Sequence, residues 1–228
     1  MVYDICMRKD VLANGEIYHV MNKSIAGFRI FPKDDDYLHM KNLLRYFTHT
    51  GQRQKYSQFL RDVNIHKENI EEEIGRVLAG KNRSVQIICY GLMPTHFHLV
   101  LKQLHEHGIE KFMSDVSNAY ARYFNTKTER KGPLWVGRFQ SVNVNNDDYF
   151  LHLTRYIHLN PVSAGLVKNA SDWQYSSFFE YINQDSVKFP VCDFSGLMPF
   201  LGKQYEKFTN DQADYQKNLA RIKAICLD

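Results

Sequence analysis

"SVQIICYGLMPTHFHLVLKQ", residues 84–103, is the stretch that decides the fold. It holds two runs rich in apolar and β-branched residues, 84–92 and 96–103, which are separated only by Met93-Pro94-Thr95. Such runs, interrupted by a short segment that contains proline, are typical of two strands joined by a turn. We therefore predict an antiparallel hairpin in the middle of the chain.

The second strand of this hairpin carries two histidines, His96 and His98. Because side chains alternate between the faces of a strand, both imidazoles point to one face, and Phe97 and Leu99 point to the other. Two interpretations are open. The histidines are either half-buried and hydrogen-bonded to backbone, or they bind a divalent metal ion together. Two ligands would leave coordination positions for a third protein group, water and substrate.

Strand and helix patterns continue on both sides of the hairpin. "EIYHVMNKS" (16–24) and "LWVGRFQSVNV" (134–144) alternate as strands. Apolar residues recur with helical spacing in four other segments, 34–49, 108–128, 146–160 and 161–167. We expect Pro161 to end the third of these helices and Gly165 to break the fourth. The order β-α-(α)-β-β-α-β-α predicts an α+β fold with a ferredoxin-like or split βαβ topology, an antiparallel sheet covered by helices.

Length and composition favour one large globular domain. The 228 residues suggest a main domain at 1–186, with a polar helical insertion at 50–84, and a helical C-terminal appendage at 187–228. The net charge of +4 permits a nucleic-acid partner without requiring one. The four cysteines show no CxxC spacing, which argues against a zinc knuckle or a disulfide framework and fits a reducing compartment. No apolar run approaches membrane-spanning length, so we expect a cytoplasmic protein with no membrane partner.

The segment 146–160 carries a polar stripe. Asp148, His152, Tyr156 and Asn160 are spaced four residues apart and share one side of the predicted helix. Such a stripe is usually a solvated face. Tyr156, however, stands between an imidazole and an amide, where a phenol can act as a nucleophile with a ligand one turn away. Tyr149 lies off this stripe.

Several motifs, taken in order, carry a family resemblance. They are "GLMPTHFHLVL", "NAYARYFN", "GPLWVGRFQS", "DDYFLHLTRYIHLNPVSAGLV" and "DWQYSS". Together they resemble the REP-associated branch of the single-tyrosine HUH transposases, over a region from "IYHVMNKS" to about Phe178. The resemblance implies a ferredoxin-like (RRM-like) domain that nicks single-stranded DNA at hairpin-bearing, REP-like sites. It also implies that His96 and His98 are the HUH histidines, that Tyr156 is the catalytic tyrosine, and that Asn160 is a further metal ligand.

The chemistry implied by the resemblance is phosphoryl transfer. His96, His98 and Asn160 would hold Mg²⁺ or Mn²⁺ at the scissile phosphate. The oxygen of Tyr156 would attack the phosphorus and form a 5′-phosphotyrosine, leaving a free 3′-hydroxyl on the other DNA end. Imidazole is softer than Mg²⁺ prefers, so we expect Mn²⁺ to support activity at least as well.

A basic segment beside this site is the candidate DNA-binding surface. A run of positive charge is most often only solvated surface, but beside a metal site it is where phosphates would lie. Trp135 either stacks on a base or fills the core. The candidate contacts are Arg138, Lys127, Arg130, Lys131, Trp135 and, at the end of the first strand, Lys23.

Other functions stay open at this point. The chain could be a domesticated protein that binds DNA hairpins without transposing, although binding alone needs neither the histidines nor Tyr156. It could also be a metal-dependent hydrolase without a covalent step, or an RRM-like RNA-binding module, but the central strands carry histidines in place of the paired aromatics of such modules. A monomer and a homodimer are both compatible with the sequence. The long segment 50–84 either faces DNA or serves as scaffold.

Overall fold

The central feature of the computed structural model, which describes residues 11–51, 54–62 and 70–211, is a four-stranded sheet. All neighbouring strands are antiparallel and follow the order β2-β3-β1-β4. The strands are β1 (Ile17–Lys23), β2 (Val85–Met93), β3 (His96–Gln103) and β4 (Gln140–Asn143). The predicted hairpin is β2–β3, and this strand order confirms the predicted ferredoxin-like topology.

The fourth strand is shorter than the predicted span of 134–144, and that part of the prediction is wrong. Only Gln140–Asn143 form a continuous ladder with β1. Residues 137–139 leave the ladder, and before them the N–H of Val136 donates to the carbonyl of Lys23 at 3.0 Å and Ser24 forms an isolated antiparallel bridge with Trp135. The Nε1 of Trp135 donates to the carbonyl of Ser117 at 3.0 Å, and its ring meets that of Phe97 edge to face at 5.5 Å. The predicted strand is therefore interrupted at residues 137–139 and does not form a single ladder.

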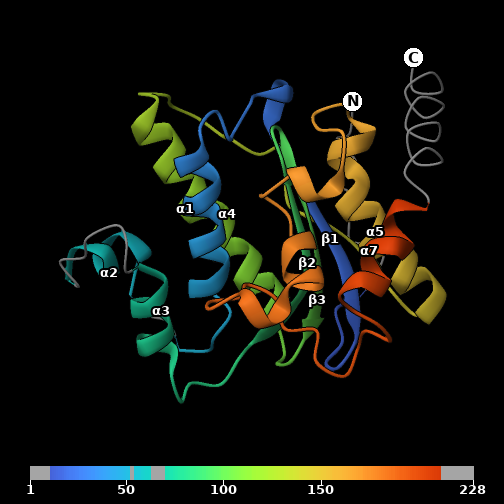
Figure 1. Cartoon of the computed structure of the whole chain (residues 1–228). Helices are drawn as coiled ribbons and strands as arrows, with labels where there is room; N and C mark the ends of the chain where they lie inside the picture. Colours follow the sequence, from blue (N-terminus) through green and yellow to red (C-terminus); the bar gives the residue numbers. More distant parts are fainter. Residues whose placement is uncertain (1–10, 52–53, 63–69, 212–228) are drawn as a thin grey trace, which may run out of the picture.

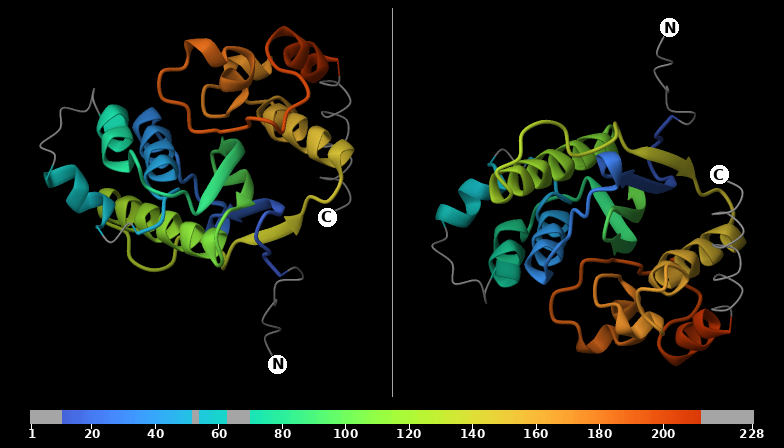
Figure 2. Two further views of the ribbon diagram at one scale, coloured as in Figure 1. Left: turned by 90° about the horizontal axis from the view of Figure 1, so that it is seen from below. Right: turned by 90° about the horizontal axis from the view of Figure 1, so that it is seen from above.

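Helices α1 (Asp34–Tyr46) and α4 (Gly108–Lys127) cover one face of the sheet. Figures 1 and 2 show them side by side, with α2 (Tyr56–Asp62) and α3 (Ile70–Leu78) beyond them. The sheet contributes the alternate residues Phe97, Leu99 and Leu101 to the core on this side, and all three are fully buried. Burial of large apolar side chains from both layers is the main force that holds helices and sheet together.

The polar segment 50–84 joins the same core through four apolar side chains. Tyr56 and Phe59 of α2 and Ile74 and Leu78 of α3 are buried against it. The segment is therefore part of the scaffold of this face, although its outer surface is polar.

Helix α5 (Asp147–Ser163) lies on the opposite face of the sheet, together with α6 (Phe178–Ile182) and α7 (Lys203–Asn210) (Figure 1). It continues two residues past Pro161, so the predicted helix end at this residue and the separate helix at 161–167 are wrong. Proline lacks the N–H that would bond to the carbonyl of Ile157. The helix nevertheless closes, because the amide of Ala164 donates to the carbonyl of Asn160 at 2.9 Å. The turn then ends at Gly165, whose φ is 69°.

The segment after 186 contributes to both cores. Tyr205 of α7 is fully buried and bonds through its hydroxyl to Nδ1 of His158 at 2.7 Å. The carboxylate of Glu180 accepts hydrogen bonds from the amides of Val191 and Cys192. The part of the predicted helical appendage beyond residue 211 lies outside the described residues, and the division of the chain at 186 stays a prediction. Short 3₁₀ turns complete the structure at Ile25–Gly27, Ala170–Asp172 and Gln184–Ser186.

Candidate active site

Three histidines and one tyrosine converge on the face of the sheet that α5 covers. The rings of His96 and His98 lie 5.1 Å apart, edge to face. The ring of Tyr156 stands at right angles to that of His98, with 5.9 Å between the centroids. The structure thus brings together three of the predicted site residues, and it does so within a single chain.

The third histidine, His19 of β1, was not predicted. Its Nε2 lies 3.0 Å from Nδ1 of His98, and the two rings stack with 5.2 Å between centroids. Strand alternation alone does not place His19 beside His98, because their contact depends on the register between β1 and β3, in which Met21 pairs with His98. A histidine inside an otherwise apolar run was the available signal.

His96 and His98 each have one ring nitrogen already engaged. Nδ1 of His96 lies 3.1 Å from the hydroxyl of Thr95, and Nδ1 of His98 is taken by His19. Within the described part of the chain, no hydrogen bond reaches Nε2 of either ring. The two Nε2 atoms are therefore available on this face as lone-pair donors to a metal ion.

Burial keeps both rings neutral at neutral pH. It lowers the pKa of His98 well below 6.5, and the neighbouring His19 and His96 add to the effect. It also lowers the pKa of His96, to which the positive charge of Lys23 contributes. Only a neutral imidazole has a lone pair to give a metal ion, so these shifts suit metal ligands.

Tyr156 is half-buried, and burial raises the pKa of its phenol, with a smaller contribution from Tyr149. The phenol therefore carries its proton at neutral pH. The close approach of α5 to the sheet, which sets the position of Tyr156, depends on Gly91 of β2. A side-chain carbon on Gly91 would lie only 2.8 Å from Cγ2 of Ile157, the residue next to Tyr156.

Asn160 and His152 are the other polar residues of the predicted stripe that flank Tyr156. Asn160 is half-buried one turn after Tyr156, and within the described residues it makes no side-chain hydrogen bond to His96 or His98. His152 is exposed, and its Nδ1 contacts the guanidinium of Arg155 at 2.5 Å.

A divalent cation on this face would have few protein ligands and several open coordination positions. Across the described ranges, no three His, Cys, Asp or Glu side chains are grouped to hold a metal ion. A cation here would depend on Nε2 of His96 and His98 and on the amide of Asn160. Water and phosphate oxygens would fill the remaining positions, which suits Mn²⁺ or Mg²⁺ in a catalytic site.

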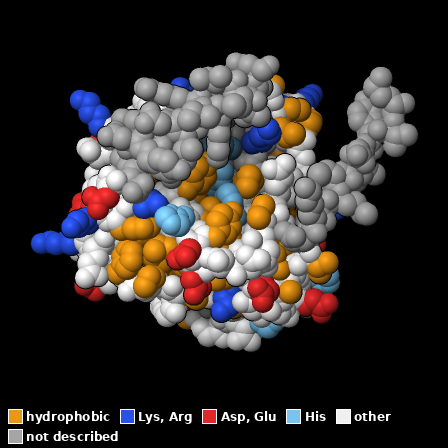
Figure 3. Space-filling view, turned by 90° about the vertical axis from the view of Figure 1, so that its right-hand side faces the viewer, with side chains coloured by type: hydrophobic (Ala, Val, Ile, Leu, Met, Phe, Trp, Pro, Cys, Tyr) orange, Lys and Arg blue, Asp and Glu red, His pale blue; other side chains and the backbone are white. Residues whose placement is uncertain are grey.

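Of the predicted DNA contacts, only Lys23 is placed beside these histidines. It pairs with His96 in the sheet register and is exposed. Arg138 and Lys131 are exposed on the connection before β4. Figure 3 shows the side of the molecule that lies to the right in Figure 1, where histidine side chains sit among hydrophobic ones.

The remaining three predicted contacts are engaged by the protein itself. Lys127 forms an ion pair with the buried carboxylate of Asp36. The guanidinium of Arg130 donates to the carbonyl of Pro133 at 2.6 Å and lies over the ring of Phe28. Trp135 is half-buried and packs against the core, and its Nε1 donates to the carbonyl of Ser117. A DNA role for these three stays a prediction.

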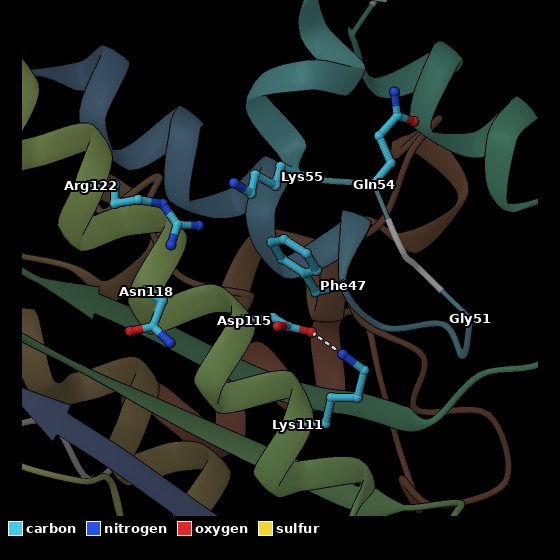
Figure 4. A pocket seen from close by; sticks show the side chains of 8 residues that line it. All are labelled: Phe47, Gly51, Gln54, Lys55, Lys111, Asp115, Asn118 and Arg122. Carbon is cyan, nitrogen blue, oxygen red and sulfur yellow. Dashed lines mark hydrogen bonds and ion pairs between the residues drawn. The ribbon is translucent and has the colours of Figure 1, made fainter.

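A basic hollow of about 540 Å³ lies on the α4 side of the sheet, between α4 and the start of α2. Figure 4 shows the charged ends of Lys55 and Arg122 turned toward one another across it, while Lys111 is paired with Asp115 at 2.8 Å. The sheet separates this hollow from Tyr156.

No helix in the described parts of the chain is both long and apolar enough to cross a membrane.

Comparisons with known proteins agree with this fold. Residues 48–160, which include His96, His98 and Tyr156, match the family model described as "Transposase IS200 like". A curated REP-associated tyrosine transposase of Escherichia coli (strain K12) is 27% identical over 101 residues, which are 43% of this chain and 57% of that protein. The match therefore spans little more than half the length of that relative.

A solved structure titled as a REP-associated tyrosine transposase bound to a REP hairpin has the same fold. It superposes with a TM-score of 0.50 at 17% identity, over 87% of this chain and 98% of that one. By the match of its residues 48–160, the chain is similar to the IS200-like transposases.

Proposed function

We propose that this chain is a metal-dependent single-stranded DNA endonuclease and strand transferase that acts at hairpin-bearing DNA through a 5′-phosphotyrosine. The observation that carries the proposal is the approach of Tyr156 to His98, 5.9 Å between ring centroids, on a face with two neutral histidines. Hairpin-bearing DNA is the proposed substrate class because the solved structural neighbour is bound to a REP hairpin.

Each residue has a definite part in this reaction. The phenol oxygen of Tyr156 attacks the phosphorus and loses its proton, and the bond from phosphorus to the 3′ oxygen breaks. The products are a tyrosine linked to the 5′ phosphate and a free 3′-hydroxyl. Because the phosphodiester energy is kept in this link, the attack of a second 3′-hydroxyl can rejoin strands.

His96, His98 and Asn160 are the proposed ligands of Mg²⁺ or Mn²⁺. When bound, the cation would polarise the scissile phosphate and offset its developing charge. Lys23, exposed beside His96, is placed to contact a neighbouring phosphate.

A covalent-adduct assay tests the proposal. The chain is incubated with single-stranded hairpin oligonucleotides and Mn²⁺, and protein–DNA adducts are separated on a denaturing gel. We expect an adduct with the natural chain and with Tyr149→Phe, which removes an exposed phenol from the same helix. We expect none with Tyr156→Phe, although that variant still binds the hairpin.

Two results would count against the proposal. An adduct that persists in Tyr156→Phe removes this tyrosine as the nucleophile. Hairpin binding without an adduct in any variant favours a domesticated protein that binds DNA hairpins without transposition.

A further inference from the structure

His19 is buried in the interior of the sheet, only 5% exposed, on the same face as the HUH histidines. In the sheet register it lies between Val100 of β3 and Val142 of β4. Its Nε2 makes a 3.0 Å hydrogen bond with Nδ1 of His98. This bond joins residues 79 positions apart in the sequence, and therefore requires the folded sheet.

A hydrogen bond between two neutral imidazoles has two possible arrangements. In the first, Nδ1–H of His98 donates to Nε2 of His19, and the lone pair on Nε2 of His98 is free. In the second, Nε2–H of His19 donates to Nδ1 of His98, whose own proton then occupies Nε2. Only the first arrangement allows His98 to bind a cation through Nε2.

We infer that His19 is a positioning residue that accepts the Nδ1–H of His98 and so keeps Nε2 of His98 available to a divalent cation. The inference rests on the proposed function to the extent that it takes His98 as a metal ligand. Partners of this kind set the tautomer and orientation of metal-binding histidines, and their loss typically costs about 10–100-fold in metal affinity.

The surroundings of the two ligands explain why His98 needs this partner. His96 bonds through Nδ1 to the hydroxyl of Thr95, its neighbour in sequence. His98 is more deeply buried than His96 and has no such local partner among the described residues. A leucine at position 19 would fill the space between Val100 and Val142 but would leave Nδ1 of His98 unsatisfied.

Two substitutions separate this role from simple packing. His19→Leu keeps an apolar side chain at the site and removes the acceptor. His19→Gln keeps a long side chain with an amide oxygen that can accept from Nδ1–H. The full-length, metal-free chain is used, labelled with ¹⁵N on histidine, and ¹⁵N NMR reports which ring nitrogen of His98 carries the proton. Mn²⁺ affinity is measured in parallel by electron paramagnetic resonance, without DNA.

We expect the His98 proton on Nδ1 in the natural chain and in His19→Gln, and on Nε2 for a substantial share of His19→Leu. Mn²⁺ affinity should fall about 10–100-fold in His19→Leu and stay within about threefold in His19→Gln. The tautomer of His96 should not change in either variant, which controls for general disruption of the site.

Several outcomes would overturn the inference. They are unchanged Mn²⁺ affinity in His19→Leu, equal losses in both variants, and a natural chain whose His98 carries its proton on Nε2. The last measurement needs no variant and decides the question even if His19→Leu does not fold.

Failure of the proposed function is seen separately. A His19-dependent Mn²⁺ affinity in a chain that forms no tyrosine adduct would reject the proposed reaction and leave the role of His19 standing. An adduct formed by a chain whose Mn²⁺ affinity ignores position 19 would reject the role of His19 alone. A natural chain that binds no Mn²⁺ would reject both.

Discussion

Gly91 sets how closely α5 approaches the sheet, and its substitution by alanine tests the geometry of the site. Gly91 lies opposite His98 in the β2–β3 ladder and directly beneath Ile157. A side-chain carbon there would stand 2.8 Å from Cγ2 and 3.3 Å from the carbonyl oxygen of Ile157. Neither atom is the free end of a flexible side chain, so the helix itself must move outward.

The size of the effect follows from these distances. Ordinary contacts between carbon atoms begin near 3.5 Å, so α5 must retreat by several tenths of an ångström. Insertion of an extra methyl group into a packed core typically costs about 1–3 kcal/mol of stability. Tyr156 moves with the helix, and a misplacement of about 1 Å between reacting groups can cost about 10²-fold in rate. We therefore expect a 10- to 100-fold slower adduct formation by Gly91→Ala.

The assay pairs this variant with a glycine that has free space. Gly75, inside α3, has no atom within 4 Å of the added carbon, so Gly75→Ala should stabilise the chain by roughly 0.5–1 kcal/mol. Both variants are compared with the natural chain in urea unfolding and in the rate of adduct formation. The double variant Gly91→Ala, Ile157→Ala should lose less stability than the sum of its single changes, because the clash with Cγ2 is gone.

Adduct formation at the natural rate in Gly91→Ala, with unchanged stability, would refute this reasoning. So would strictly additive losses in the double variant, because they would mean that residues 91 and 157 do not meet.

Three further predictions concern stability and DNA contact. Burial lowers the pKa of His158 from 6.5 to about 3. As the pH falls through this range, the unfolded chain therefore binds a proton that the folded chain does not bind. The free energy of unfolding should fall by about 4–5 kcal/mol between pH 6.5 and 3. Urea unfolding across this range should show a flatter pH profile in His158→Gln, and equal slopes would contradict the assignment. Lys127→Ala leaves the buried carboxylate of Asp36 without its cation and should cost roughly 2 kcal/mol in thermal unfolding; unchanged stability with weakened DNA binding would make Lys127 a DNA contact instead. Lys23→Ala should lower the slope of the logarithm of hairpin affinity against salt by about 0.7, whereas a change no larger than that of the exposed control Lys203→Ala would remove Lys23 from the DNA-binding surface.

The fold was predictable where the signal is local. The hairpin at 84–103, the helix α4 and the order of strands and helices follow from alternation and helical spacing, and all are present. The errors arose where a distant contact decides the local structure. The predicted strand at 134–144 is interrupted at residues 137–139, and the turn at Gly165 closes a helix that has already passed Pro161.

The site was predictable in part for the same reason. His96, His98 and Tyr156 were identified by their spacing and the family resemblance, and they meet in the structure. His19 was missed because its position beside His98 depends on the pairing of two strands far apart in the sequence.

Basic and aromatic residues were the least predictable. The residue types that bind DNA also make ion pairs and fill cores, and a sequence does not show which use applies. Lys127 and Trp135 illustrate both cases, since each is held by the protein's own residues.

The most direct test of the central claim is to locate the covalent link on the protein. The adduct with a hairpin oligonucleotide is digested with nuclease and trypsin, and the peptide that carries the nucleotide is identified by mass spectrometry. Cleavage after Arg138, Arg155 and Lys168 separates residues 139–155, which hold Tyr149, from residues 156–168, in which Tyr156 is the sole tyrosine. The account predicts a nucleotide linked through phosphate to Tyr156. A nucleotide on any other residue, or none on a chain that has cut the strand, would contradict it.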